Sequence, residues 1–158
     1  MKHLKTPIAF ACLVGLIALI PQIASAQKNP RIGVWTLDLA KSTYQQGAAP
    51  ASETRTYLAT NDGGLQLTAN EVLASGTKRP GGYRAKYDGK DHPFTSVAGD
   101  TIAITGDGWT SDSTIKMGGK VTQTSHGVVS KDGSTLTIVT KTASGQDVST
   151  RVYHKQKK

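Results

Sequence analysis

Cysteine is almost absent from this sequence, since Cys12 is the single one among 158 residues. One thiol cannot form an intramolecular disulfide, so the fold depends on its core and its backbone hydrogen bonds. A helical period is lacking as well, because no long stretch beyond residue 26 repeats apolar residues at i, i+3, i+4 and i+7. Leucine is scarce, whereas threonine, serine and glycine are abundant. This composition favours strands and turns over helices.

Clustered metal ligands are also lacking. A zinc site needs three or four converging side chains, and the histidines beyond residue 26 are far apart in sequence: His92, His126 and His154. The segment Asp88-Gly89-Lys90-Asp91 lacks the alternating acidic ligands and distal Glu of a calcium loop, so we interpret it as a hairpin turn. The sequence therefore predicts no bound metal.

Motifs of covalent catalysis and phosphate binding are missing too. Ser-x-x-Lys occurs twice, but on a strand and in a loop rather than on a helix, at Ser75/Lys78 and Ser113/Lys116. Neither pair is accompanied by a Gly-x-Ser-x-Gly or Lys-Thr-Gly motif, and no glycine-rich phosphate loop is present. We therefore expect neither an enzyme nor a cofactor.

An export signal is predicted at the start of the chain. Lys2 and Lys5 precede an uncharged run over residues 8–20, and the small-residue stretch Ala24-Ser25-Ala26 follows. This order is typical of a secretory signal peptide. Pro21 interrupts the run before the ~20 residues of a membrane span, and Cys12 lies inside the run, whereas a lipid anchor would need it at the cleavage point. We expect a signal peptide at residues 1–26, one domain at 27–158, and a periplasmic or extracellular location.

The charge balance is basic. Cleavage after Ala26 would lower the formal net charge from +8 to +6, leaving 17 basic against 11 acidic residues. This excess favours anionic partners such as lipid headgroups or acidic polysaccharide. The cations are spread along the chain, except at Lys78-Arg79 and at Lys155, Lys157 and Lys158. A nucleic-acid face usually combines clustered cations with aromatic residues, so no nucleic-acid partner is expected.

Turn signals divide the chain at short intervals. Asp-Gly is the strongest short hairpin signal, and it is joined by two further turn dipeptides; the six are Asp62-Gly63, Asp88-Gly89, Asp107-Gly108, Gly118-Gly119, Asp132-Gly133 and Ser144-Gly145. Their spacing is typical of an antiparallel meander or barrel. The stretches 40–52 and 74–82 do not follow the pattern and are predicted to be loops, the second of them basic and flexible.

Between the turns, apolar residues recur with a period of two, which predicts strands with one buried face. The residues expected to face inward are Gly33, Trp35, Leu37, Leu39, Leu65, Leu67, Ala69, Tyr83, Ala85, Tyr87, Ile102, Ile104, Trp109, Ile115, Met117, Leu136, Ile138, Val148 and Val152. We predict an all-β fold of eight to ten antiparallel strands. A sandwich fits the pattern, but a closed barrel is favoured because it leaves no exposed edges. The charged outer faces argue against an outer-membrane barrel, so we expect a soluble monomer.

The segment Gly33-Val34-Trp35 resembles the Gly-x-Trp motif that opens lipocalins and related calycin barrels. The chain also resembles a group of small secreted bacterial proteins of unknown function, described as lipocalin-like, in three segments: Gly33–Ser42, Lys86–Pro93 and Val129–Thr137. The resemblance implies a calycin-type barrel. It further implies that Trp35, with Gly33, plugs one end and packs against an arginine near the C-terminus, for which Arg151 is the candidate.

The barrel interior is the candidate ligand site. Aromatic rings and hydroxyls are expected to share it, at Tyr83, Tyr87, Trp109, Ser111 and Ser113. Such a mixture is typical of small-molecule sites, although aromatic residues also fill packed cores. Two functions therefore stay open. One is the binding of a small, partly apolar or amphipathic ligand, and the other is non-enzymatic adhesion to anionic envelope or matrix surfaces.

Overall fold

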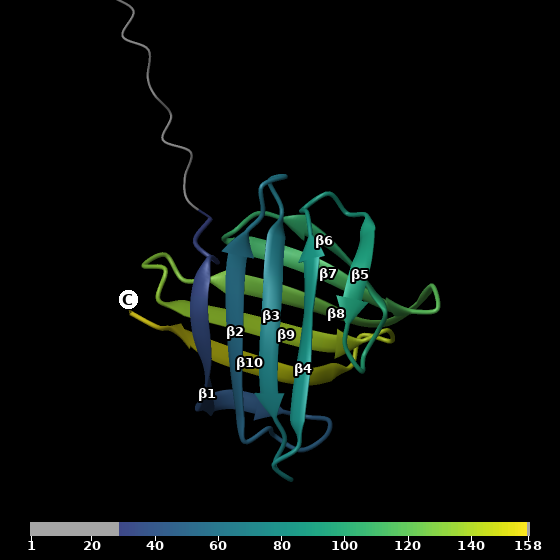
Figure 1. The fold of residues 1–158 in the computed structure, drawn as a ribbon. Helices are drawn as coiled ribbons and strands as arrows, with labels where there is room; N and C mark the ends of the chain where they lie inside the picture. Colours follow the sequence, from purple (N-terminus) through teal and green to yellow (C-terminus); the bar gives the residue numbers. More distant parts are fainter. Residues whose placement is uncertain (1–28, 158) are drawn as a thin grey trace, which may run out of the picture.

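The computed structural model describes residues 29–157 and shows an all-β closed barrel (Figure 1). The predicted signal peptide, residues 1–26, lies outside the described residues. The strands are β1 (Gly33–Tyr44), β2 (Ser52–Ala59), β3 (Leu65–Val72), β4 (Lys78–Ala85), β5 (Asp91–Thr95), β6 (Thr101–Gly106), β7 (Thr110–Met117), β8 (Lys120–Val129), β9 (Thr135–Thr142) and β10 (Asp147–Lys155).

The strands form an antiparallel meander that closes on itself. Each strand pairs with its neighbour in sequence, and β1 pairs with β10 to complete the ring. In Figure 1, β1–β4 stand in front and β7–β10 cross behind them. The prediction of a closed barrel with eight to ten strands is confirmed. Within residues 29–157, no helix is long and apolar enough to cross a membrane.

The predicted turns fall between strands. All six turn dipeptides lie in connections, from β2–β3 to β9–β10. The tightest is the two-residue link Gly118-Gly119 between β7 and β8, where φ is 56° and 79°. Two successive positive φ angles are the geometry of a type I′ hairpin, which side chains other than hydrogen disfavour.

Both predicted loops are shorter than expected. Strand β1 continues to Tyr44, since a bulge between Asp38 and Thr43 breaks its apolar alternation without ending its pairing. Strand β4 begins at Lys78, so residues 78–82 of the basic loop pair with β3 instead of lying free. At Gly82 the backbones approach closely, and a Cβ there would overlap the carbonyl oxygen of Leu67. The glycines that suggest a loop therefore serve strand contact.

The inward faces form the core, in two clusters at Trp35, Leu37, Tyr57, Leu65, Leu67, Val129, Leu136, Ile138 and Tyr153, and at Ala85, Ile102, Ile104 and Ile115. Leu39 and Met117, expected inside, are exposed. Val152 is another correction, because the inward Leu37 pairs with Tyr153 while Val152 pairs with Asp38 on the outer face. Ser149, Arg151 and Tyr153 consequently point inward.

Trp35 is fully buried at one end of the barrel, with 0% of its surface exposed. Its Nε1 donates a hydrogen bond of 2.8 Å to the carbonyl oxygen of Arg31, in the turn that precedes β1. The cation over the indole ring is Lys155, 5.0 Å from the ring centre. The expected pairing of Trp35 with Arg151 is wrong, because the guanidinium of Arg151 forms an ion pair with the buried carboxylate of Glu53.

Candidate functional site

A cavity of about 610 Å³ lies inside the barrel. All ten strands contribute residues to its wall. One end reaches three connections, through Gln46–Ala49, Leu73–Ser75 and Ser96–Ala98. At the other end, where Trp35 is buried, the wall includes Arg31, whose carbonyl oxygen accepts from the Trp35 indole. The volume falls within the ~300–1,000 Å³ of small-molecule sites.

The wall of the cavity is part apolar and part polar. Its apolar side chains include Leu67, Phe94, Ile102, Ile115 and Ile138. Its small polar side chains come from neighbouring strands, and Ser113 and Ser125 join β7 to β8 through a 3.2 Å contact between their Oγ atoms. An apolar wall with a few placed hydroxyls can both bury and orient a partly apolar molecule.

The structure brings three of the five predicted ligand residues to the cavity. Tyr83, Ser111 and Ser113 line it. Tyr87 and Trp109 lie just beyond the ends of β4 and β7 and pack against the larger core cluster. Tyr87 also accepts a 3.4 Å hydrogen bond from Asn29 at its hydroxyl. These two rings help to cover the end of the barrel beside Trp35.

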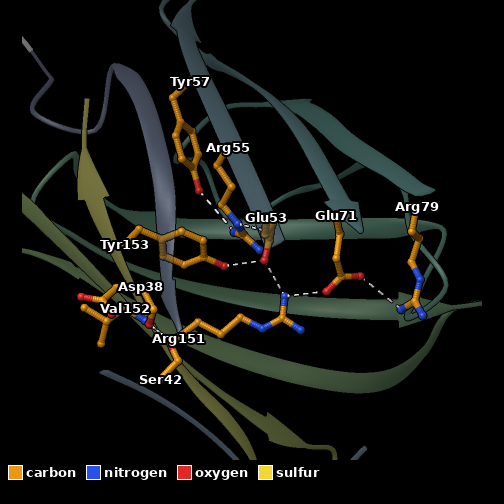
Figure 2. A network of polar contacts seen from close by, with 10 residues as sticks. All are labelled: Asp38, Ser42, Glu53, Arg55, Tyr57, Glu71, Arg79, Arg151, Val152 and Tyr153. Carbon is orange, nitrogen blue, oxygen red and sulfur yellow. Dashed lines mark hydrogen bonds and ion pairs between the residues drawn. The ribbon is translucent and has the colours of Figure 1, made fainter. Parts of the chain in front are cut away.

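A buried carboxylate inside the barrel, that of Glu53, accepts hydrogen bonds from three side chains. Glu53 on β2 is only 2% exposed. Figure 2 shows three donors converging on it: Arg55 Nε at 2.7 Å, Arg151 Nη1 at 2.6 Å and the Tyr153 hydroxyl at 2.8 Å. Both carboxylate oxygens are therefore used, as the burial of such a charge requires.

A second carboxylate extends this network across the cavity. Arg151 Nη1 also lies 3.1 Å from Glu71 on β3, and Glu71 lies 3.4 Å from Arg79 on β4 (Figure 2). The guanidinium of Arg55 lies 5.1 Å from the ring centre of Tyr153, a cation–π geometry. The chain of alternating charges crosslinks β2, β3, β4 and β10 from the inside.

The network was not predicted, because inward positions were sought among apolar residues. Glu53, Arg55 and Tyr57 alternate with Thr54 and Thr56, so their period of two was present in the sequence. Charged residues that alternate in this way are ordinarily assigned to the solvent-exposed face of a strand. The signal that could have found them is a Glu-x-Arg-x-Tyr alternation in a chain whose last strand carries Arg-x-Tyr.

The neighbours of Glu53 favour its charged form. Burial alone would raise the pKa of Glu53, but Arg55, Arg151 and the Tyr153 hydroxyl hold that pKa below its ordinary value. Burial raises the pKa of the Tyr153 hydroxyl, which stays protonated and able to donate. Glu53 is thus an anion held by two cations and one neutral donor.

Acid should destabilise the barrel through Glu53. Because its folded pKa is lowered, its contribution is present above the unfolded pKa of ~4.3 and is lost as pH falls through the folded pKa. In that window we expect the free energy of unfolding to fall by up to about 1.4 kcal/mol per pH unit from this residue. Urea titrations from pH 6 downward should show a shallower slope for Glu53→Gln than for the wild type. Parallel slopes would contradict this role.

The three histidines, for which no metal site is predicted, lie on three different strands, β5, β8 and β10. Each is paired with one aspartate: His92 with Asp88 at 2.9 Å, His126 with Asp112 at 2.8 Å, and His154 with Asp38 at 2.8 Å. Within residues 29–157, no three His, Cys, Asp or Glu side chains gather as metal ligands would.

The fold of the chain is a closed antiparallel meander barrel around an internal cavity that reaches one end, the architecture of calycin-type barrels. Among solved structures, the chain is similar to the fluorescent protein UnaG. The wild-type protein matches with a TM-score of 0.56 and 12% identity, over 79% of this chain and 96% of that one. A mutant of UnaG matches with a TM-score of 0.59 and 11% identity, over 82% of this chain and 99% of that one. At this identity the likeness shows the fold.

Zebrafish ileal bile acid-binding protein complexed with cholic acid is also similar, with a TM-score of 0.49 and 13% identity, over 80% of this chain and 99% of that one. No protein-family model matches the chain. No curated protein sequence matches it either.

Proposed function

We propose that the protein binds a small, partly apolar molecule inside its barrel. The observation that carries this proposal is the cavity of about 610 Å³. Protein interiors are close-packed, and their voids rarely exceed a water molecule. A space of this size, lined by aromatic, aliphatic and hydroxyl groups, is too large for a packing defect and has the composition of a ligand site.

The residues of the cavity wall also favour a binding protein over an enzyme. The carboxylates that line the cavity, Glu53 and Glu71, are both engaged by arginines, so neither is poised as a general base. We further propose that the protein works after export, in the periplasm or outside the cell. Intact mass spectrometry of protein recovered from its host measures this. A mass that corresponds to a chain beginning at Gln27 would support the proposal, and the mass of the uncleaved chain would contradict it.

Filling the cavity should weaken ligand binding. Ser113 lines the cavity, so Ser113→Phe would place a ring in the space that a ligand needs. We expect the affinity for the neutral fluorescent probe N-phenyl-1-naphthylamine to fall by about tenfold or more, which corresponds to about 1.4 kcal/mol. Fluorescence titration measures this loss.

The matched control is Thr114→Phe, one residue along β7 and on the opposite face from Ser113. It should bind the probe like the wild type. Native mass spectrometry of protein purified from its own host gives an independent reading, with an added mass that disappears on denaturation. Apo mass throughout, together with no probe binding, would overturn the proposal.

The alternative hypothesis, adhesion to anionic surfaces, rested partly on Lys78-Arg79. Arg79 lies against Glu71 at 3.4 Å and lines the cavity mouth, while Lys78 is exposed on the outer face. The pair therefore does not form one basic surface patch, and adhesion stays a prediction from the net charge and from the basic C-terminal residues Lys155, Lys157 and Lys158.

A further inference from the structure

Arg31 is a buried cation at the closed end of the cavity. It precedes β1 and is 4% exposed. Both polar groups of its backbone are hydrogen-bonded. The N–H donates to Asn29 Oδ1 at 3.0 Å, and the carbonyl oxygen accepts from Trp35 Nε1 at 2.8 Å. The side chain extends from this anchored turn into the cavity wall.

Gly127 on β8 makes room for the guanidinium. A Cβ at Gly127 would lie 2.9 Å from Arg31 Nη1, 3.1 Å from Nη2 and 3.4 Å from the Oγ of Ser111. The guanidinium therefore lies over the inward face of β8, beside the hydroxyl of Ser111. One hydrogen bond holds it there, from Nη2 to the carbonyl oxygen of Gly127 at 3.1 Å.

The guanidinium of Arg31 has no carboxylate partner among residues 29–157, and its buried Nε has no hydrogen-bond acceptor there. The other three arginines that line the cavity each lie within 4 Å of a carboxylate: Arg55, Arg79 and Arg151. The cavity holds four arginines against two glutamates, a net charge of +2. A buried charge without a counter-charge is unfavourable.

The charge of Arg31 also acts on the carboxylate of Asp107. Hydrogen bonds from the backbone N–H groups of Thr110 and Trp109 lower the pKa of Asp107, and the charge of Arg31 adds a smaller effect in the same direction. The carboxylate of Asp107 is thus committed to capping the β6–β7 turn and leaves the guanidinium available.

We infer that the closed end of the cavity is a subsite for the anionic group of the ligand, bound by Arg31 and the hydroxyl of Ser111. The ligand class is an amphipathic organic anion whose carboxylate, sulfonate or phosphate lies at the closed end and whose apolar part fills the cavity. Hydrogen bonds from a guanidinium to such a group are charge-assisted and geometrically selective. This inference rests on the proposed function.

Two probes that share one ring system test the charge. 8-Anilino-1-naphthalenesulfonate carries a sulfonate, and N-phenyl-1-naphthylamine is the same skeleton without it. For the protein spanning residues 27–158 we expect the sulfonate to bind about tenfold more tightly or better than the neutral probe. Arg31→Met should weaken the sulfonate by about tenfold or more and change the neutral probe by less than about threefold.

Gly127→Ala is a second variant that keeps the charge but displaces the guanidinium, at the flexible end of its side chain. It should likewise reduce the preference for the sulfonate over the neutral probe. If Arg31→Met does not fold, Gly127→Ala alone tests whether the Arg31 guanidinium binds the anionic group. Arg84→Met is the matched control, because Arg84 is exposed on the outer face of β4. It should leave both affinities within about twofold of the wild type.

The outcomes separate the two proposals. If the neutral probe binds but both variants leave the sulfonate affinity unchanged, the anion subsite is overturned and the proposed function stands. If neither probe binds and Ser113→Phe changes nothing, the proposed function fails and the inference fails with it. Loss of sulfonate preference in both variants, with thermal unfolding still cooperative, supports the subsite.

Discussion

Replacement of Glu53 by glutamine is expected to lower the free energy of unfolding by about 3–5 kcal/mol. The amide keeps the volume of the side chain but removes its charge. Arg55 and Arg151 would then lie beside each other inside the barrel without the anion that both contact. Since most of the cost is the uncompensated charge that remains, the loss should exceed that of an ordinary hydrogen bond.

Urea denaturation at neutral pH measures this difference. The control is Asp147→Asn, which removes an exposed carboxylate from an ion pair with Lys141 and should cost at most about 1 kcal/mol. A double variant, Glu53→Gln with Arg151→Met, should recover part of the stability, because one of the stranded cations is gone. If Glu53→Gln costs no more than Asp147→Asn, the network does not stabilise the barrel.

Replacement of Trp35 by alanine should also cost about 3–5 kcal/mol, as expected for removal of a large buried aromatic side chain. Trp35 is fully buried, and its indole holds the turn that carries Arg31. We therefore expect two effects, a loss of stability and a loss of sulfonate binding, because the anchor of Arg31 goes with the indole. Denaturant titration and probe fluorescence measure them on the same protein.

Trp35→Phe separates these effects. It retains most of the buried ring but removes the donor to the Arg31 carbonyl oxygen, so its stability should fall by less than that of the alanine variant. Leu58→Ala, at an exposed position of β2, serves as the control and should change stability by about 0.5 kcal/mol or less. Equal losses for Trp35→Ala and Leu58→Ala would contradict the role of Trp35.

Turns and apolar alternation were readable from the sequence because they are local. The six turn dipeptides lie in strand connections, and Leu65, Leu67, Leu136 and Ile138 are buried as their period predicts. Closure was predicted from the need to avoid sheet edges, and β1 pairs with β10 as that argument requires.

The polar interior was not predictable in the same way. Whether Arg151 faces inward depends on the register of β10 against β1, which places Tyr153 opposite Leu37. No local pattern encodes that register. The burial of Arg31 likewise depends on the missing side chain of Gly127, a residue distant in sequence. Both placements depend on contacts between segments that are distant in sequence. Considered alone, Arg151 and Arg31 would each be assigned to the surface.

The order in which the ring is assembled has a consequence for folding. Nine of the ten strand pairings join consecutive strands, and the tenth joins β1 to β10, where Trp35 pairs with Lys155. Local hairpins form quickly, whereas contacts between distant segments pay the entropy of loop closure first. The ring therefore cannot close until the last strand has been synthesised. That strand also carries Arg151 and Tyr153, so the carboxylate of Glu53 gains them as partners only at the closing step.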